Sequence, residues 1–216
     1  MRRFAPLLLV VLVAAACGGP STDTVGTVSP ATSAPEPVAP SSTMAPNPTL
    51  SAESPFGEAL AATQAASAYA FEATVSLFPA SGEVKVELSG WVDGADRELL
   101  VTAGDQTVKT LVLDGVATVI GPDGATEIPL AEAPTGPSLG LLGMVQVTEE
   151  GPGMVRGVLP AAAVPDFGQG DTEPVDAQIT IFYEDVITGY QLADPGNSWV
   201  VEVTFANVGE SQTPNA

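Results

Sequence analysis

The sequence predicts an α+β fold, in which helices cover the concave face of one strongly curved antiparallel sheet. Three observations predict it. An alanine-rich helical segment comes first, period-two strands with tight turns follow, and short apolar helical segments interrupt the later strands. A sheet with one apolar face must bury that face. We therefore expect the helical segments to lie in the hollow of the sheet.

The first expected element is a helix that begins at Phe56 and ends near Ser67. Its alanines favour helix, and Phe56 and Leu60 fall on one stripe. Beyond this helix the hydrophobic period changes to two, which is typical of a half-buried strand. The apolar positions of this first strand are Phe71, Ala73, Val75 and Leu77.

Four further strands are expected at close spacing. Gly104-Asp105 and Asp114-Gly115 are hairpin signals between apolar runs. Together with the first strand, these segments predict a five-stranded antiparallel meander. The four strands are expected at residues 84–89, 97–103, 107–113 and 116–120.

The second half of the chain mixes short helical segments with strands. An apolar cluster at 139–145 follows a Pro-Thr-Gly-Pro turn and predicts a short helix. Residues 160–165 are bounded by prolines, as expected for a helix of one or two turns. The remaining strands are expected at residues 154–159, 175–183, 189–193 and 199–205.

The N-terminus has the three parts of a secretory signal. Arg2 and Arg3 precede an apolar run of 13 residues that ends at Ala16, whereas a membrane-spanning helix needs roughly 20 residues. Small residues end directly on Cys17 and two glycines follow it. This arrangement resembles the bacterial lipobox, in which the cysteine becomes the N-terminus and receives acyl chains. Cys17 is thus the candidate lipidation site after a lipoprotein signal peptide at 1–17, and the alternative is an incidental cysteine in an ordinary signal peptide.

A tether is expected at residues 18–55. Eight prolines, seven serines and six threonines stand there, with no aromatic residue and no lysine or arginine. Such a segment cannot bury enough apolar surface to offset its chain entropy, so we expect it to be disordered. It would hold a folded domain, expected at 56–209, away from a membrane, and its serines and threonines beside prolines could also carry O-linked sugars. A disordered tail is expected at 210–216.

The charge balance excludes several classes of function. The chain has 26 acidic and 6 basic residues, a formal net charge of −20 and no histidine. An acidic surface repels phosphate backbones, which excludes nucleic-acid binding. Without histidine there is no His-based catalytic pair and no His-ligated zinc. We therefore expect no enzyme, no cofactor and no nucleic-acid partner.

Clustered carboxylates do not change this expectation. Nothing in the spacing of Asp93, Asp96 and Glu98 selects a catalytic acid–base pair. Asp93 and Asp96 could supply oxygen ligands to calcium, but their spacing does not match an EF-hand loop, so a solvated turn is the favoured interpretation. No metal site is expected.

An apolar cavity is the remaining candidate site. The side chains expected to line it come from three strands and from the 139–145 segment, where flexible methionine suits irregular apolar ligands. Ordinary core packing is the alternative for each of them, as it is for Trp91 and Tyr183. The candidate cavity residues are Phe71, Val75, Leu139, Leu142, Met144, Ile179, Ile181 and Trp199.

Short sequence islands carry a resemblance to a known family. They are Ala59-Leu60-Ala61-Ala62 running into Ser67-Ala68-Tyr69-Ala70-Phe71, Gly157-Val158-Leu159 before a small-residue helix, Pro174-Val175-Asp176-Ala177, and Gly196-Asn197-Ser198-Trp199-Val200-Val201. With the lipobox and tether, they resemble the LppX/LprG group of actinobacterial cell-envelope lipoproteins, in the LolA/LolB-like superfamily. The resemblance implies a half-open β-barrel with helices across its concave face. It also implies anchoring at the cell membrane or in the envelope, and carriage of acylated lipid or glycolipid in an apolar cavity.

Two readings of that fold stay open. In one, the core is partly hollow and acyl chains fill it; in the other, the core is filled and the protein is a surface adaptor or structural lipoprotein. If the ligand has a charged head group, one of four cations is its expected partner. These cations are Lys85, Arg97, Lys109 and Arg156.

Overall fold

The computed structural model describes residues 54–79, 82–164, 175–196 and 198–212. Cys17, the expected signal peptide and nearly all of the expected tether lie outside these residues. Within them, no helix has the length and apolar character needed to cross a bilayer.

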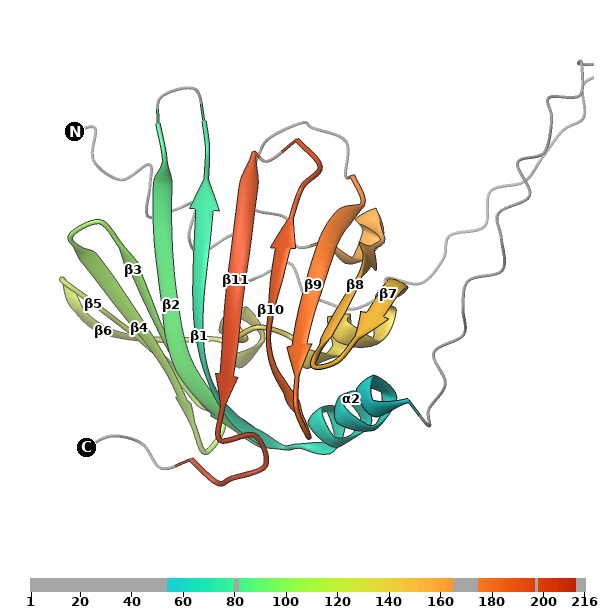
Figure 1. The fold of residues 1–216 in the computed structure, drawn as a ribbon. Helices are drawn as coiled ribbons and strands as arrows, with labels where there is room; N and C mark the ends of the chain where they lie inside the picture. The colour runs from blue at the N-terminus through green and yellow to red at the C-terminus, as the bar shows by residue number, and fades with distance from the viewer. Residues whose placement is uncertain (1–53, 80–81, 165–174, 197, 213–216) are drawn as a thin grey trace, which may run out of the picture.

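The described residues form one open antiparallel sheet of eleven strands (Figure 1). The spatial order is β6-β5-β4-β3-β2-β1-β11-β10-β9-β8-β7, so the first and last strands meet in the middle. The strands are β1 (Ala68–Leu77), β2 (Val84–Asp93), β3 (Asp96–Ala103), β4 (Gln106–Leu113), β5 (Val116–Gly121), β6 (Gly124–Ile128), β7 (Gln146–Gly151), β8 (Met154–Leu159), β9 (Ala177–Tyr183), β10 (Ile187–Ala193) and β11 (Trp199–Ala206). The expected large antiparallel sheet and its meander are confirmed, while β6 and β7, the two edge strands, were not expected.

The expected N-terminal helix is confirmed as α2 (Pro55–Ala65). The Ser54 side chain accepts a hydrogen bond from the backbone N–H of Gly57, and Pro55 occupies the first helical position, where its missing N–H costs nothing. The helix ends because Ala66 has an extended backbone, and β1 begins two residues later.

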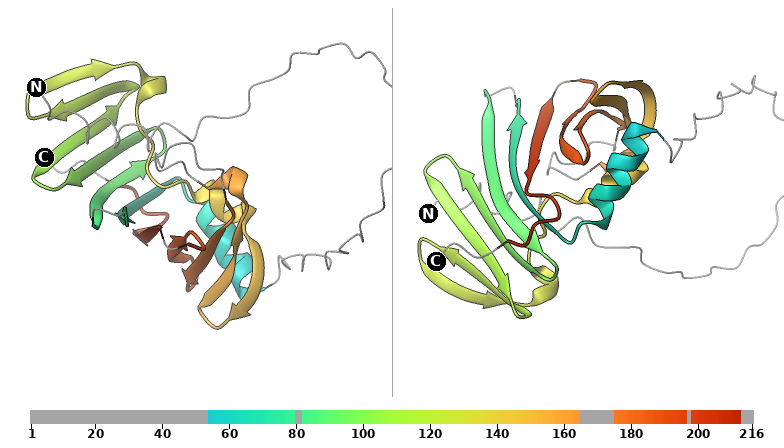
Figure 2. Two further views of the ribbon diagram at one scale, coloured as in Figure 1. Left: turned by 90° about the horizontal axis from the view of Figure 1, so that it is seen from above. Right: turned by 60° about the horizontal axis from the view of Figure 1, so that its bottom comes forward.

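Two contacts fix α2 against the end of the sheet that holds β9 and β10. The ring of Phe56 lies 5.6 Å from that of Tyr183. The Thr63 hydroxyl donates to the Ala59 carbonyl at 2.8 Å and accepts from the Ile187 backbone N–H at 2.7 Å. Figure 2 shows β7–β10 curling round α2, while β2–β6 form a flatter wing.

The later helical segments are shorter than expected. Residues 139–145 and 160–165 were expected to form short helices, but they form only the 3₁₀ turns η2 (Leu139–Met144) and η3 (Ala161–Ala163). Gly140 and Gly143 weaken any longer helix in η2. A further turn, η1 (Leu130–Glu132), follows β6. Of these turns, η2 packs against α2, which itself contacts β10.

The strand register divides the sheet into two chemically different faces. We call the face that carries the core and meets α2 the inner face, and the opposite one the outer face. Val75 of β1 pairs with Val86 on one side and with Val201 on the other, so all three lie on the inner face. Their sequence neighbours, such as Glu87 and Glu202, lie on the outer face.

Candidate functional site

Seven of the eight candidate cavity residues meet in one apolar cluster. Strands β1, β9 and β11 supply five of them from the inner face, and η2 supplies Leu139 and Leu142. Leu142 is fully buried, while Leu139 packs partly buried against the cluster. The cluster members are Phe71, Val75, Leu139, Leu142, Ile179, Ile181 and Trp199. Their proximity agrees with either a filled core or a ligand-lined wall, so their role as cavity lining stays a prediction.

Met144 and Trp91 lie elsewhere. The side chain of Met144 is 50% exposed at the end of η2. Trp91 pairs with Ala70, whereas Phe71 pairs with Gly90, so Trp91 lies on the outer face and does not line the hollow. The sequence already contained this signal. The apolar residues of β2 from Val84 onward stand at even-numbered positions, whereas Trp91 stands at an odd-numbered one and so belongs to the opposite face.

The inner face of the wing is apolar but only half covered. Val86 and Leu88 of β2 and Val101 of β3 are partly buried, in contrast to the buried inner-face positions of β9–β11. Val108 of β4 and Val119 of β5 are half-buried on the same face. Val101 pairs with Val108, and Val119 pairs with Thr110, so the apolar surface continues across the wing. These five side chains form what we call the wing face. They followed from the alternation pattern but were not singled out from the sequence.

The wing face lies on a surface that is almost free of charge. Register assigns Arg97 as the sole charged residue on the inner face of β1–β6 and β8–β11 within the described chain. Its Nε donates to the Pro134 carbonyl at 3.2 Å and its Nη1 to the Ala95 carbonyl at 3.4 Å. Arg97 is thus engaged by backbone oxygens at one end of the wing.

A crossover segment, residues 129–138, passes over this end of the inner face. It joins edge strand β6 to η2 and runs behind the sheet in Figure 1. Ala133 is buried with Val112 and Ala117, which closes a small second cluster on β4 and β5. Further along, the Pro137 carbonyl accepts a hydrogen bond from the Tyr69 hydroxyl at 3.2 Å. The crossover therefore covers one end of the wing. It leaves the wing face, which lies toward the other end, without this cover.

Two aromatic side chains anchor the crossover. A Cβ built on Gly136 would lie 2.7 Å from the Phe71 ring, so the crossover backbone rests directly on that ring. Tyr69 stacks edge-on against Phe205 with ring centroids 5.7 Å apart. Burial raises the pKa of the Tyr69 phenol above its usual value, because the anion loses hydration. The neutral, donating phenol is thus the stable form across the physiological range.

The other described cations are paired on the outer face. Lys109 Nζ lies 2.6 Å from Glu98 Oε2, and Arg156 Nη1 lies 3.2 Å from Glu149 Oε2. Lys85 Nζ lies 2.8 Å from Glu87 Oε1, and the hydrogen bond and charge of that carboxylate raise the pKa of Lys85. None of these three points to the inner face, so the four cations do not form a basic rim around the wing face.

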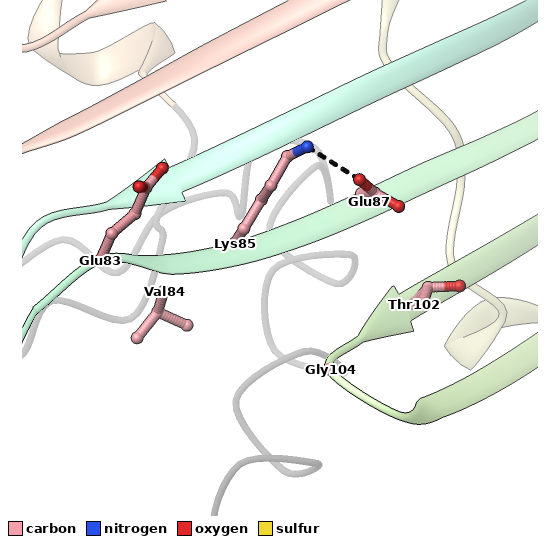
Figure 3. A pocket seen from close by; sticks show the side chains of 6 residues that line it. All are labelled: Glu83, Val84, Lys85, Glu87, Thr102 and Gly104. Carbon is pink, nitrogen blue, oxygen red and sulfur yellow. Dashed lines mark hydrogen bonds and ion pairs between the residues drawn. The ribbon is translucent and has the colours of Figure 1, made fainter.

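A shallow groove lies beside the start of β2 and the end of β3 (Figure 3). Its volume is about 460 Å³, and its lining residues are Glu83, Val84, Lys85, Glu87, Thr102 and Gly104. Figure 3 shows the charged side chains on one side of β2 and Val84 on the other. The Lys85–Glu87 ion pair and the Glu83 carboxylate make this groove too polar for an acyl chain and too acidic for an anion, so it is not the candidate site.

The carboxylates considered for calcium have structural partners. Asp93 Oδ2 accepts from the Ser211 hydroxyl at 2.6 Å and from the Gln212 N–H at 3.0 Å. Asp96 Oδ1 accepts from the Asp114 N–H at 3.0 Å. No group of three or more His, Cys, Asp or Glu side chains capable of holding a metal occurs among the described residues. The first residues of the expected 210–216 tail thus contact β2.

Comparison with known proteins gives similar solved structures. The chain is similar to LprF from Mycobacterium bovis, with 15% identity and a TM-score of 0.48, over 74% of this chain and 94% of that one. It is also similar to the lipoprotein LppX from Mycobacterium tuberculosis, with 14% identity and a TM-score of 0.46, over 74% of this chain and 95% of that one. A LolA superfamily protein from Nitrosomonas europaea is similar with 11% identity and a TM-score of 0.33, over 76% of this chain and 94% of that one.

The resemblance indicated by the sequence and the comparison of folds name the same group of proteins. LppX and a LolA superfamily protein both stand among the similar structures. No family model and no curated protein matches the chain. At these identities the likeness assigns no ligand, so the function has to be argued from the chain's own residues.

Proposed function

We propose that this protein is an exported cell-envelope lipoprotein whose domain binds the acyl chains of a lipid or glycolipid on the inner face of its sheet. The observation that carries this proposal is the wing face, a half-covered apolar surface continuous with the main core. An acyl chain laid on it would remove apolar surface from water, at about 25 cal/mol per Å². Such binding is non-directional and needs no catalytic group, so the proposed protein is not an enzyme.

The arrangement of cover supports a one-ended site. Helix α2, η2 and the crossover segment would form the helical cover of a half-barrel, filling the end of the hollow near Tyr69 and Phe56. The opposite end, where Val84 and Val86 lie, has less cover. Acyl chains would therefore enter from the end of the sheet opposite α2.

The proposal assigns roles to the whole chain. Residues 1–17 direct export and end on the acylated Cys17, residues 18–55 tether the domain, residues 56–209 bind lipid and residues 210–216 follow as a tail. Because the domain is strongly acidic, it repels anionic head groups, so the acyl anchor supplies the membrane contact.

A charged side chain placed on the wing face should abolish lipid binding. Val101→Asp puts a carboxylate where an acyl chain would lie, and burying that charge beneath a chain is strongly unfavourable. Its neighbour Thr102 lies on the outer face, so Thr102→Asp is the matched control. We expect Val101→Asp to weaken binding of a fluorescent fatty-acyl probe by more than about tenfold, since 1.4 kcal/mol corresponds to a factor of ten.

Titration of the delipidated protein with that probe measures the effect. Wild type and Thr102→Asp should bind and gain thermal stability with probe concentration, as ligand linkage requires. If wild-type protein binds no probe, or if both substitutions weaken binding equally, the wing face is not the site.

One observation favours a second candidate function. The β7–β11 half is densely packed, with Val155, Leu159 and Ile181 fully buried. A domain filled in this way over its entire inner face would serve as an envelope adaptor or structural module without a ligand. Native mass spectrometry after mild extraction separates the two, because a carrier retains lipid at near one-to-one stoichiometry and an adaptor retains none.

Removing the candidate acylation site should release the protein from the membrane. In Cys17→Ser the thiol that would accept the diacylglyceryl group is missing, so neither lipidation nor signal cleavage at this position can follow. We expect the variant in the soluble or unprocessed fraction after cell fractionation. Retention in the membrane fraction with the mass of the wild-type mature form would contradict the assignment of Cys17.

A further inference from the structure

Strands β3 and β4 of the wing are apolar on both faces. Each contains an uninterrupted apolar run, at 99–101 in β3 and at 111–113 in β4. Strand β9, in contrast, alternates strictly between buried residues and more exposed ones. Continuous apolar runs are typical of strands that are covered on both sides of their sheet. The two runs therefore indicate that something covers the outer face of the wing.

The outer-face side chains of these strands and of β5 form one apolar patch. In register, the side chains of Leu113 and Val116 are direct neighbours on β4 and β5. Val116 is 51% exposed and Ile120 is 38% exposed, while the others are partly exposed. Adjoining apolar side chains that stay exposed mark interaction sites, whereas single ones do not. We call five side chains the outer patch: Leu100, Leu111, Leu113, Val116 and Ile120.

An ion pair lies in the middle of the outer patch. Glu98 pairs with Leu111, and Lys109 pairs with Leu100 on one side and with Ile120 on the other. The Lys109 and Glu98 side chains are 31% and 16% exposed, and their charged atoms lie 2.6 Å apart. The centre of the patch is thus neutral, although the chain as a whole carries a net charge of −20.

A second copy of the chain matches this pattern of charge. In a two-fold interface each copy presents the same surface, so Lys109 of one copy can face Glu98 of the other, and the reverse. A strongly acidic or basic partner would match only one of the two charges. A bilayer would match neither, because burying charged groups in hydrocarbon is costly. We infer that two copies of this chain associate back to back through their outer patches.

The outer face of the wing is large enough for such an interface. Its five strands, at roughly 4.8 Å spacing and about seven residues of 3.3 Å each, have a projected area of about 550 Å². Two such faces bury more than about 1,100 Å², because side-chain relief adds to the projected area, and the smallest stable interfaces bury about 1,200 Å². The wing is also the flatter part of the sheet, which favours face-to-face packing (Figure 2).

The arrangement leaves the wing face free in both copies. The wing face lies on the inner face and the outer patch on the opposite side of the same strands. A back-to-back dimer therefore turns both wing faces outward. The inference does not rest on the proposed function, and association can be measured without any lipid.

Sedimentation equilibrium of the full chain tests the inference. The chain is produced as Cys17→Ser, so that no acyl anchor contributes to self-association, and we expect it to dimerise in the micromolar range. The additional change Ile120→Asp should raise the dissociation constant by about hundredfold or more, because each dimer would then bury two carboxylates without partners. Phe182→Asp is the matched control, since Phe182 is 44% exposed on the outer face of β9, outside the patch.

Three results would overturn the inference. A wild type that stays monomeric is one, and if that monomer floats with phosphatidylcholine vesicles, the patch belongs to a membrane. A dimer that survives Ile120→Asp, or one that Phe182→Asp weakens equally, would place the interface elsewhere. Binding of the fatty-acyl probe should be the same in Ile120→Asp and wild type, so loss of the dimer with probe binding retained separates this inference from the proposed function.

Exchange of the central charges keeps the test independent of folding losses. Lys109→Glu leaves two acids in the middle of the patch, and Glu98→Lys leaves two bases. We expect each variant alone to be monomeric, because like charges then face each other across the two-fold axis. An equimolar mixture should form a heterodimer, since the acidic centre of one variant faces the basic centre of the other. A mixture that stays monomeric would contradict the back-to-back arrangement.

Discussion

Gly90→Ala is expected to destabilise the domain more than a glycine-to-alanine substitution at any other described glycine of the wing. A Cβ at this position would lie 2.0 Å from the Glu98 carbonyl oxygen of the neighbouring strand. That oxygen belongs to the backbone of β3, so it cannot move without breaking the pairing of β2 with β3. We expect a loss of about 3 kcal/mol, at the upper end of overpacking costs, because no side chain can rotate away.

The same position also explains how the crossover segment is seated. The Phe71 ring lies 3.1 Å from the Cβ position of Gly90 and 2.7 Å from that of Gly136. The ring is thus held between two glycines, one on β2 and one on the crossover. Gly90→Ala pushes the ring toward the crossover and should loosen the cover at that end of the wing.

Denaturant unfolding measures this prediction, with Gly121→Ala as its control. A Cβ at Gly121, near the other end of the wing, meets no heavy atom within 4 Å, and the residue needs no left-handed backbone. Gly121→Ala should therefore leave the free energy of unfolding within about 0.5 kcal/mol of wild type. Equal stability of Gly90→Ala and wild type would show that β2 and β3 pair in another register.

The meander could be predicted from two signals. β1 and β2 alternate between apolar and polar residues, while β3–β5, which keep no strict alternation, are separated by turns with glycine at positive φ, such as Gly104 and Gly115. The two edge strands lack a clear alternation. β6 has nearly all its residues exposed, and in β7 a register shift between Val147 and Glu149 interrupts the alternation.

Most members of the apolar cluster could be predicted from the sequence, although Met144 lies outside it, but the arrangement of the cluster could not. Buried alternation identified Phe71, Ile181 and Trp199, because a strand buried on one face repeats every second residue. The sequence could not show that β1 and β11 pair in the middle of the sheet, since that contact joins the two ends of the folded chain. Nor could it show that the crossover rests on Phe71, because the contact depends on how β6 connects to η2.

The second prediction with a large effect concerns Leu142, which is fully buried in η2. Leu142→Ala removes three carbon atoms from the centre of the main cluster, so we expect a loss of about 2–5 kcal/mol from transfer and cavity terms together. Met144, two residues later, is half exposed. Met144→Ala should change the free energy of unfolding by no more than about 0.5 kcal/mol.

Comparison of this pair with and without an acyl probe decides what the cluster around η2 does. If Leu142 is part of a filled core, the cavity left by alanine is separate from the wing face, and the probe should stabilise Leu142→Ala and wild type by equal amounts. If Leu142 lines the lipid site, an acyl chain can occupy the vacated space, as apolar ligands do in dry cavities. The probe should then restore part of the lost stability, and its affinity for Leu142→Ala should rise. Because the wing face is half covered while Leu142 is fully enclosed, we expect equal stabilisation, which places acyl binding on the wing and leaves η2 as fixed cover.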